Sequence, residues 1–222
     1  MTILPCIEIE TTKSPSASVI WLHGLGANGH DFAPIVEELN LPTSLPTRFI
    51  LPHAGEIPIT INNGYIMPAW YDILEMGESR KINIEQLLHS VQSIHTLIDR
   101  ERERGIAANQ IFVIGFSQGG AVAYHAALTY PEKLAGVMGL STYFPTADTI
   151  DCHASNLNIP IKIFHGSRDP MVVESLGRQA YTDLQTLGYQ VDYKNYPIEH
   201  EVCQKEVSDI SLFLQYHLKS NL

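Results

Sequence analysis

The clearest chemical signal in the sequence is the pentapeptide Gly115–Gly119, GFSQG. It follows an apolar run, Ile111–Ile114, that is typical of a buried strand, and it leads into an Ala-rich segment typical of a helix. A strand, a tight turn and a helix with a serine at the turn form a nucleophile elbow, in which the hydroxyl stands above the sheet. The alternative is an ordinary buried turn between a strand and a helix. We predict Ser117 as a nucleophile.

A serine hydroxyl is a weak nucleophile until a base removes its proton. Behind such an elbow the acid and then the histidine follow the serine along the chain, which excludes every histidine before Ser117 as the base. His200 lies between a predicted strand that ends at Tyr196 and the final helix, and it is the predicted base. The other later histidines fit less well by position: His125, His153, His165 and His217.

The predicted acid is Asp169, in the loop that follows the apolar run Ile161–Phe164. Asp148 and Asp151 compete for the role but lie further from any strand end. Asp169 and His200 could also cap the helices that follow them. The elbow favours the catalytic interpretation of both, with Asp169 fixing the imidazole tautomer.

A glycine-rich segment, Gly24–Gly29, contains the pattern G-x-G-x-x-G after a predicted strand. A dinucleotide site would need an acidic residue at the end of the next strand. That strand, Arg48–Leu51, is followed by Pro52 and His53 instead. We therefore expect a turn whose Leu25 backbone N–H stabilises an oxyanion, and a structural role for His23.

Composition excludes several function classes. The 222 residues carry a net charge of −10 and no basic stripe, so nucleic acid is not an expected partner. The uncharged stretch between Arg104 and Glu132 is too polar for a membrane segment. Three widely spaced cysteines predict no disulfide framework and a cytoplasmic location. No metal-ligand spacing occurs, and no cofactor is expected.

The irregular region 52–82 contains PAWYD, a candidate wall for an apolar acyl pocket. Trp70 could instead anchor this loop to the core. The exposed apolar residues around 65–76 could serve a membrane, a lipid substrate or a homodimer contact. The predicted pocket residues are Met67, Trp70, Ile73, Leu74, Phe144 and Met171.

Strands and helices alternate along the whole chain, which predicts one α/β domain over 1–222. A mostly parallel central sheet with helices on both faces is expected. The further predicted strands are Val19–Leu22, Arg48–Leu51, Gly136–Leu140 and Val191–Tyr196. The predicted helices cover 84–98, Gln118–Tyr130, Leu176–Leu187 and 207–218.

These motifs together resemble the phospholipase/carboxylesterase family, which includes bacterial carboxylesterases and acyl-protein thioesterases. The matching segments are WLHGLGANGHD (21–31), PAWYDI (68–73), GFSQGG (115–120), LSTY (140–143), HGSRDPMV (165–172) and YPIEHEV (196–202). The resemblance implies an α/β-hydrolase fold, a Ser117–Asp169–His200 triad and an oxyanion hole from the backbone of Leu25 and Gln118. It implies a serine esterase for small-molecule or lipid acyl esters.

One residue departs from the family pattern: Glu199 stands where bacterial relatives usually have glycine before the base. Pointing into the site, its carboxylate would favour a charged imidazole; pointing to solvent, it would change nothing. The departure leaves a non-catalytic binding protein as an alternative, and Gly24–Gly29 leaves a nucleotide-dependent enzyme. Within the esterase class, short-to-medium acyl chains are expected, with long-chain thioesters or lysophospholipids as the alternative.

Overall fold

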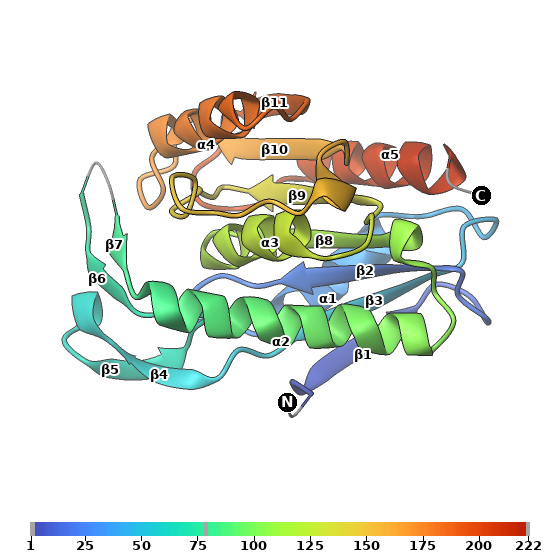
Figure 1. Ribbon diagram of the computed structural model, residues 1–222, viewed down its shortest axis with the longest axis horizontal. Helices are drawn as coiled ribbons and strands as arrows, with labels where there is room; N and C mark the ends of the chain where they lie inside the picture. Colours follow the sequence, from blue (N-terminus) through green and yellow to red (C-terminus); the bar gives the residue numbers. More distant parts are fainter. Residues whose placement is uncertain (1–2, 78–79, 221–222) are drawn as a thin grey trace.

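The computed structural model describes residues 3–77 and 80–220 and is built on a seven-stranded sheet (Figure 1). The strand order is β1-β3-β2-β8-β9-β10-β11. Neighbouring strands are parallel except that β1 runs antiparallel to β3. The strands are β1 (Cys6–Glu10), β2 (Ala17–Leu22), β3 (Thr47–Pro52), β8 (Ile111–Phe116), β9 (Gly136–Leu140), β10 (Ile161–Gly166) and β11 (Val191–Tyr196).

Helices cover both faces of this sheet, as predicted. On one face α2, α3 and α4 bury their apolar side chains, and in Figure 1 α2 and α3 lie in front of the strands. On the other face α1 and α5 pack against a second apolar cluster. The helices are α1 (Gly29–Glu38), α2 (Ile84–Glu103), α3 (Gln118–Thr129), α4 (Glu174–Thr186) and α5 (Gln204–Ser220), with short 3-10 turns at Thr60–Asn62, Ala108–Gln110 and Ala154–Asn156.

The predicted strands and helices agree with the observed ones within a few residues, but region 52–82 was wrongly expected to be irregular. It forms two hairpins, β4 (Glu56–Ile59) with β5 (Tyr65–Pro68) and β6 (Ile73–Glu75) with β7 (Lys81–Ile82). Such short strands carry too few residues for a period to show in the sequence. Strand β1 and helix α1 were also not predicted.

The hairpins lie at the end of the sheet toward which the arrowheads of β2 and β10 point (Figure 1). The loops that follow β2, β8 and β10 open at this carboxyl end, where open α/β sheets bind their ligands. None of the described helices is long and apolar enough to cross a membrane.

Candidate active site

Ser117 occupies a strained turn between β8 and α3. Its φ is +53° and its ψ is −120°, a backbone conformation that residues other than glycine rarely adopt. Close packing around it depends on glycines: a Cβ on Gly115 would overlap the carbonyl oxygen of Gly119, and one on Gly119 would lie 2.5 Å from that of His23. These contacts explain the G-x-S-x-G spacing.

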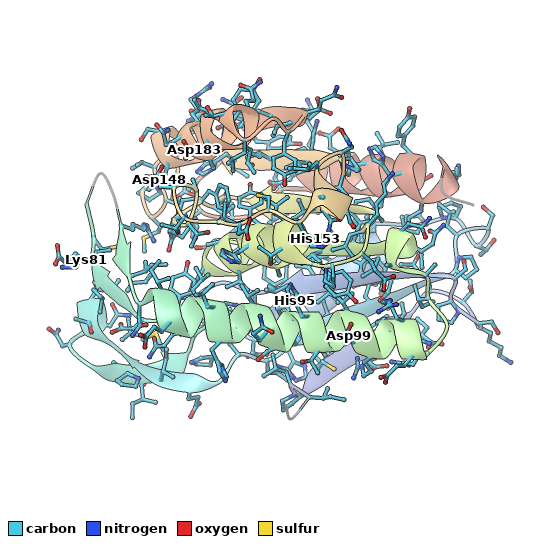
Figure 2. All side chains as sticks on the ribbon, in the orientation of Figure 1. Lys81, His95, Asp99, Asp148, His153 and Asp183 are labelled. Atoms are coloured by element: carbon cyan, nitrogen blue, oxygen red, sulfur yellow. The ribbon has the colours of Figure 1, made fainter. Side chains whose placement is uncertain are left out.

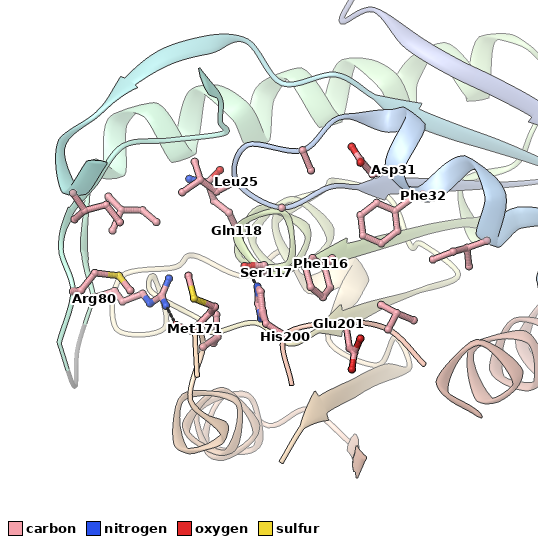
Figure 3. A pocket seen from close by; sticks show the side chains of 18 residues that line it. Leu25, Asp31, Phe32, Arg80, Phe116, Ser117, Gln118, Met171, His200 and Glu201 are labelled. Carbon is pink, nitrogen blue, oxygen red and sulfur yellow. Dashed lines mark hydrogen bonds between the residues drawn. The ribbon is translucent and has the colours of Figure 1, made fainter. Parts of the chain in front are cut away.

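The three predicted side chains meet at this turn, and Figure 3 shows Ser117 and His200 side by side. His200 Nε2 lies 3.0 Å from Ser117 Oγ, and Nδ1 lies 2.6 Å from Asp169 Oδ2. With Nδ1–H donating to the carboxylate, Nε2 is free to accept the serine proton. Ser117 and Asp169 are buried and His200 is partly exposed. The arrangement can perform nucleophilic catalysis.

Asp169 is held in its ionised form. Burial opposes ionisation, but hydrogen bonds from His200 and from the backbone N–H of Val172 and Met171 outweigh it and lower the pKa of the carboxyl. Both backbone bonds reach Oδ1 and measure 2.8 Å. The backbone therefore fixes the carboxylate through Oδ1, and Oδ2 is left to accept the hydrogen bond from the imidazole.

His165 also lies near the acid but is a structural residue. Its Nε2 is 2.8 Å from the carbonyl oxygen of Val172 and 3.9 Å from Asp169 Oδ2. Burial lowers its pKa, so the ring is neutral. His23 is similar: burial lowers its pKa, and its ring contacts the backbone of Gly24 and Ala54. The predicted structural role of His23 agrees with this geometry.

The loop that carries His200 is tied to the loop after β10. The N–H of Ser167 donates to Tyr196, and the N–H of Arg168 donates to Ile198. Glu199 is exposed and lies outside the left-handed region, so no glycine is required there. The Glu199 carboxylate points to solvent, and the departure from the family pattern leaves the site intact.

The loop after β2 and the start of α3 place two backbone donors at the cavity. Gln118 is the first residue of α3, so its N–H is among those that a helix leaves without an acceptor. In the loop, Gly26 donates to Pro68 and Ala27 donates to Gly24, while no described bond uses the N–H of Leu25. Leu25 and Gln118 line the same cavity as Ser117.

The Gln118 side chain also has a structural role, which the sequence did not reveal: it hydrogen-bonds to the backbone of a distant segment. Its Oε1 accepts the backbone N–H of Trp70 at 2.9 Å, and its Nε2 donates to the carbonyl of Tyr71 at 2.6 Å. The residue is 1% exposed. Gln118 thus joins the elbow to the 68–72 segment, and Pro68 of that segment accepts the hydrogen bond from Gly26 in the Leu25 loop.

A cavity of about 410 Å³ surrounds Ser117 and His200. Of the six predicted pocket residues, Ile73 and Met171 line it. Trp70 does not: its indole is buried, and Nε1 donates to the carbonyl of His23 at 2.8 Å, so the alternative of a loop anchor is correct. Phe144 was also wrongly placed, because it packs edge-on against Tyr124 and lines a neighbouring cleft.

Met67 and Leu74 likewise fall outside the described lining of the cavity. Met67 instead contacts the Asn62 amide through its sulfur. Residues missed by the sequence reasoning include Phe116, whose ring centroid is 4.7 Å from that of His200. Its place inside G-x-S-x-G was the available signal. The other missed lining residues are Asp31, Phe32, Ile35, Ile61, Met76, Arg80, Val172, Glu201 and Val202.

The geometry of Gly24–Gly29 opposes a dinucleotide site. Helix α1 begins at Gly29, and its N-terminus is capped by Asn28 and by the carboxylate of Asp31, which accepts the Asn28 N–H at 2.7 Å. A pyrophosphate would need this same helix terminus. The Asp31 carboxylate already occupies it and would repel a second anion.

Comparison with known proteins agrees with the fold. The family model described as phospholipase/carboxylesterase matches residues 4–218. An acyl-protein thioesterase 1 from Gibberella zeae is 37% identical over 214 residues, covering 91% of each chain.

Among solved structures, Arabidopsis thaliana SOBER1 superposes with a TM-score of 0.85 and is 30% identical, covering 91% of this chain and 99% of its own. Zea mays acyl-protein thioesterase 2 has a TM-score of 0.85 and is 25% identical, covering 96% of this chain and 99% of its own. These likenesses extend over nearly the full length of each protein. The chain has the α/β-hydrolase fold and belongs to the phospholipase/carboxylesterase family.

Proposed function

We propose that this serine ester hydrolase cleaves carboxylic esters of short-to-medium acyl chains through an acyl-Ser117 intermediate. The observation that carries the proposal is the continuous chain of contacts from Ser117 Oγ to His200 Nε2 and from His200 Nδ1 to Asp169, inside a largely apolar cavity. The cavity volume of about 410 Å³ lies near the lower end of ligand sites, which supports the shorter acyl chains.

The reaction has two halves. His200 Nε2 takes the proton of Ser117 as Oγ attacks the ester carbonyl, and the N–H groups of Leu25 and Gln118 stabilise the oxyanion. Collapse breaks the bond to the alcohol, which leaves with the proton from His200. Water, deprotonated by His200, then attacks the acyl-serine, and His200 returns this proton to Ser117 Oγ as the acid is released. Asp169 stabilises the imidazolium in both halves and remains ionised.

Acyl-protein thioesterase activity is the second candidate function. It is favoured by the Gibberella zeae relative, whose name is acyl-protein thioesterase 1 and which is 37% identical to this chain. The same site would serve, with a thiolate as the leaving group. A synthetic peptide acylated on cysteine, compared with the same peptide acylated on serine, distinguishes thioester from ester preference.

A p-nitrophenyl ester series from acetate to palmitate tests the proposed function. Wild type and Ser117→Ala are measured in parallel under identical conditions. We expect hydrolysis with an optimum at short-to-medium chains, lost in the variant. Hydrolysis that survives in Ser117→Ala would contradict the assignment of the nucleophile, and inactivity of the wild type on every ester would support the non-catalytic alternative.

We also propose that the protein works in a reducing compartment such as the cytoplasm. Cys6, Cys152 and Cys203 are free thiols in the structure. Structural disulfides are typical of oxidising compartments. Unchanged thermal stability of the purified protein with and without a reducing agent would support the proposal, and a loss of stability on reduction would contradict it.

A further inference from the structure

A second cleft lies directly behind one end of the catalytic cavity. Its volume is about 340 Å³, and its walls are mixed: the apolar residues Phe144, Pro145, Ala147, Leu176 and Ala180 lie beside polar ones. Asp148 and Asp183 also line it, from the loop after β9 and from α4 (Figure 2). Among the described lining residues, Arg80 alone belongs to both the cavity and the cleft. The two spaces are therefore neighbours with Arg80 between them.

Arg80 is held across this boundary from both sides. Its Nη2 donates to the carbonyl of Met171, on the loop that follows the catalytic acid. Its guanidinium lies over the ring of Tyr143, 4.8 Å from the centroid, and the Tyr143 hydroxyl is 2.8 Å from that of Tyr71. A planar guanidinium stacked on a ring and hydrogen-bonded at its edge has a defined position, unlike a solvated lysine.

The two ends of the catalytic cavity differ in character. Figure 3 shows Arg80 and Met171 at one end, Asp31 and Glu201 at the other, and Ser117 between them. The carboxylates of Asp31 and Glu201 are exposed, so their end is open and acidic. Ile73 and Met76 lie on the same hairpin as Arg80, and Ile61 lies in the 3-10 turn that contacts β6, so the Arg80 end is suited to an apolar chain. At the other end, Phe32 lies beside Asp31 (Figure 3). The acyl chain fits the Arg80 end, and the alcohol fits the open end.

We propose that Arg80 forms the end wall of the acyl pocket and so sets the longest acyl chain that the enzyme accepts. The inference rests on the proposed esterase function. An acyl chain that fills the cavity meets the guanidinium. Further methylene groups would take this charge out of contact with water, which is unfavourable unless the guanidinium moves aside into solvent. The cleft behind the guanidinium, whose walls include the apolar residues Phe144 and Leu176, is room that the wild-type enzyme does not use. Removal of the side chain joins the cleft to the pocket.

The test is the p-nitrophenyl ester series from acetate to palmitate on Arg80→Ala, Arg80→Met and Lys81→Ala. Met keeps most of the volume of the wall without its charge, whereas Ala opens it. Lys81 is the matched control, because it follows Arg80 on the same hairpin, points outward in Figure 2 and pairs with Glu75 at 2.9 Å. Thermal unfolding of each variant is recorded alongside.

We expect Arg80→Ala to raise the palmitate-to-octanoate ratio of kcat/KM by roughly tenfold or more, since a single methylene in an apolar pocket already changes this quantity about 10- to 200-fold. Arg80→Met should give a smaller change, and Lys81→Ala the wild-type ratio. An unchanged ratio in Arg80→Ala, an equal shift in both Arg80 variants, or a wild type that hydrolyses palmitate as well as octanoate would overturn the inference. In each of these cases activity lost in Ser117→Ala would leave the esterase function standing.

Discussion

Replacing Gln118 by methionine tests whether its hydrogen bonds to the 68–72 segment couple the nucleophile elbow to the loop that carries Leu25. Methionine keeps the length and volume of the side chain but cannot replace its two hydrogen bonds. The backbone N–H of Trp70 and the carbonyl of Tyr71 would lose their partners in a fully packed site. The perturbation removes the link while leaving the packing nearly unchanged.

The size of the effect follows from the two groups left unpaired. A buried polar group without a partner costs about 1–3 kcal/mol, so Gln118→Met should lower the free energy of unfolding by roughly 2–6 kcal/mol. The 68–72 segment also accepts the hydrogen bond of Gly26 through Pro68 at 2.8 Å. A shift of this segment would move the Leu25 N–H, and losing one oxyanion donor typically costs about 10²–10³ in kcat.

Urea unfolding and the kinetics of p-nitrophenyl butyrate hydrolysis give the two readouts. Kinetics are measured at a temperature where the variant is folded. We expect a lower kcat, with KM changed far less, because the donor acts on the transition state. Gln92→Ala, on the exposed face of α2, is the surface control. Wild-type stability and kcat in Gln118→Met would refute the link between elbow and loop.

Three further predictions follow from buried groups. Trp70→Ala should lower stability by about 3–5 kcal/mol, because the indole fills the core and bonds to His23, and it should reduce hydrolysis of every ester length alike; a changed chain-length optimum without loss of Tm would contradict this. Burial raises the pKa of Glu206 to about 8 from its ordinary 4.5, so the folded state keeps a proton that the unfolded state loses, and stability falls as pH rises through this range. As the pH rises from 4.5 to 9, the free energy of unfolding of Glu206→Gln, measured with urea, should therefore increase by up to roughly 5 kcal/mol relative to that of the wild type. Parallel curves of unfolding free energy against pH for the two proteins would count against a buried protonated acid. Gly120→Ala would place a Cβ 2.5 Å from that of Thr142, whose hydroxyl donates to the Ser117 carbonyl at 2.6 Å; we expect a loss of about 1–3 kcal/mol and a lower kcat, and an unaffected variant would show that the turn tolerates the overlap.

The three side chains of the site could be predicted from the sequence because each depends on local information. Ser117 follows an apolar strand and precedes a helix, and the loops that hold Asp169 and His200 follow recognisable strands. Parallel strands bring such loops to one edge of the sheet. Chain order and strand ends were therefore sufficient to identify the residues that the structure brings into contact.

The walls of the cavity could not be predicted in the same way, because lining depends on which side of a loop faces the cavity. Trp70 and Ile73 lie in one short segment, yet Trp70 is a core anchor and Ile73 lines the cavity. The side chain of Gln118, distant in the sequence, holds the backbone of this segment by hydrogen bonds to Trp70 and Tyr71. Arg80 was missed because its partners, Met171 and Tyr143, are distant in the sequence.

The most direct test of the central claim is labelling of wild type, Ser117→Ala and His200→Ala with an organophosphorus probe, followed by intact mass and peptide mapping. If His200 activates Ser117 across the 3.0 Å contact, the wild type should take up one adduct, on Ser117. Ser117→Ala should take up none, and His200→Ala should react at least about 10³-fold more slowly. An adduct on another residue, or an undiminished rate in His200→Ala, would contradict the account.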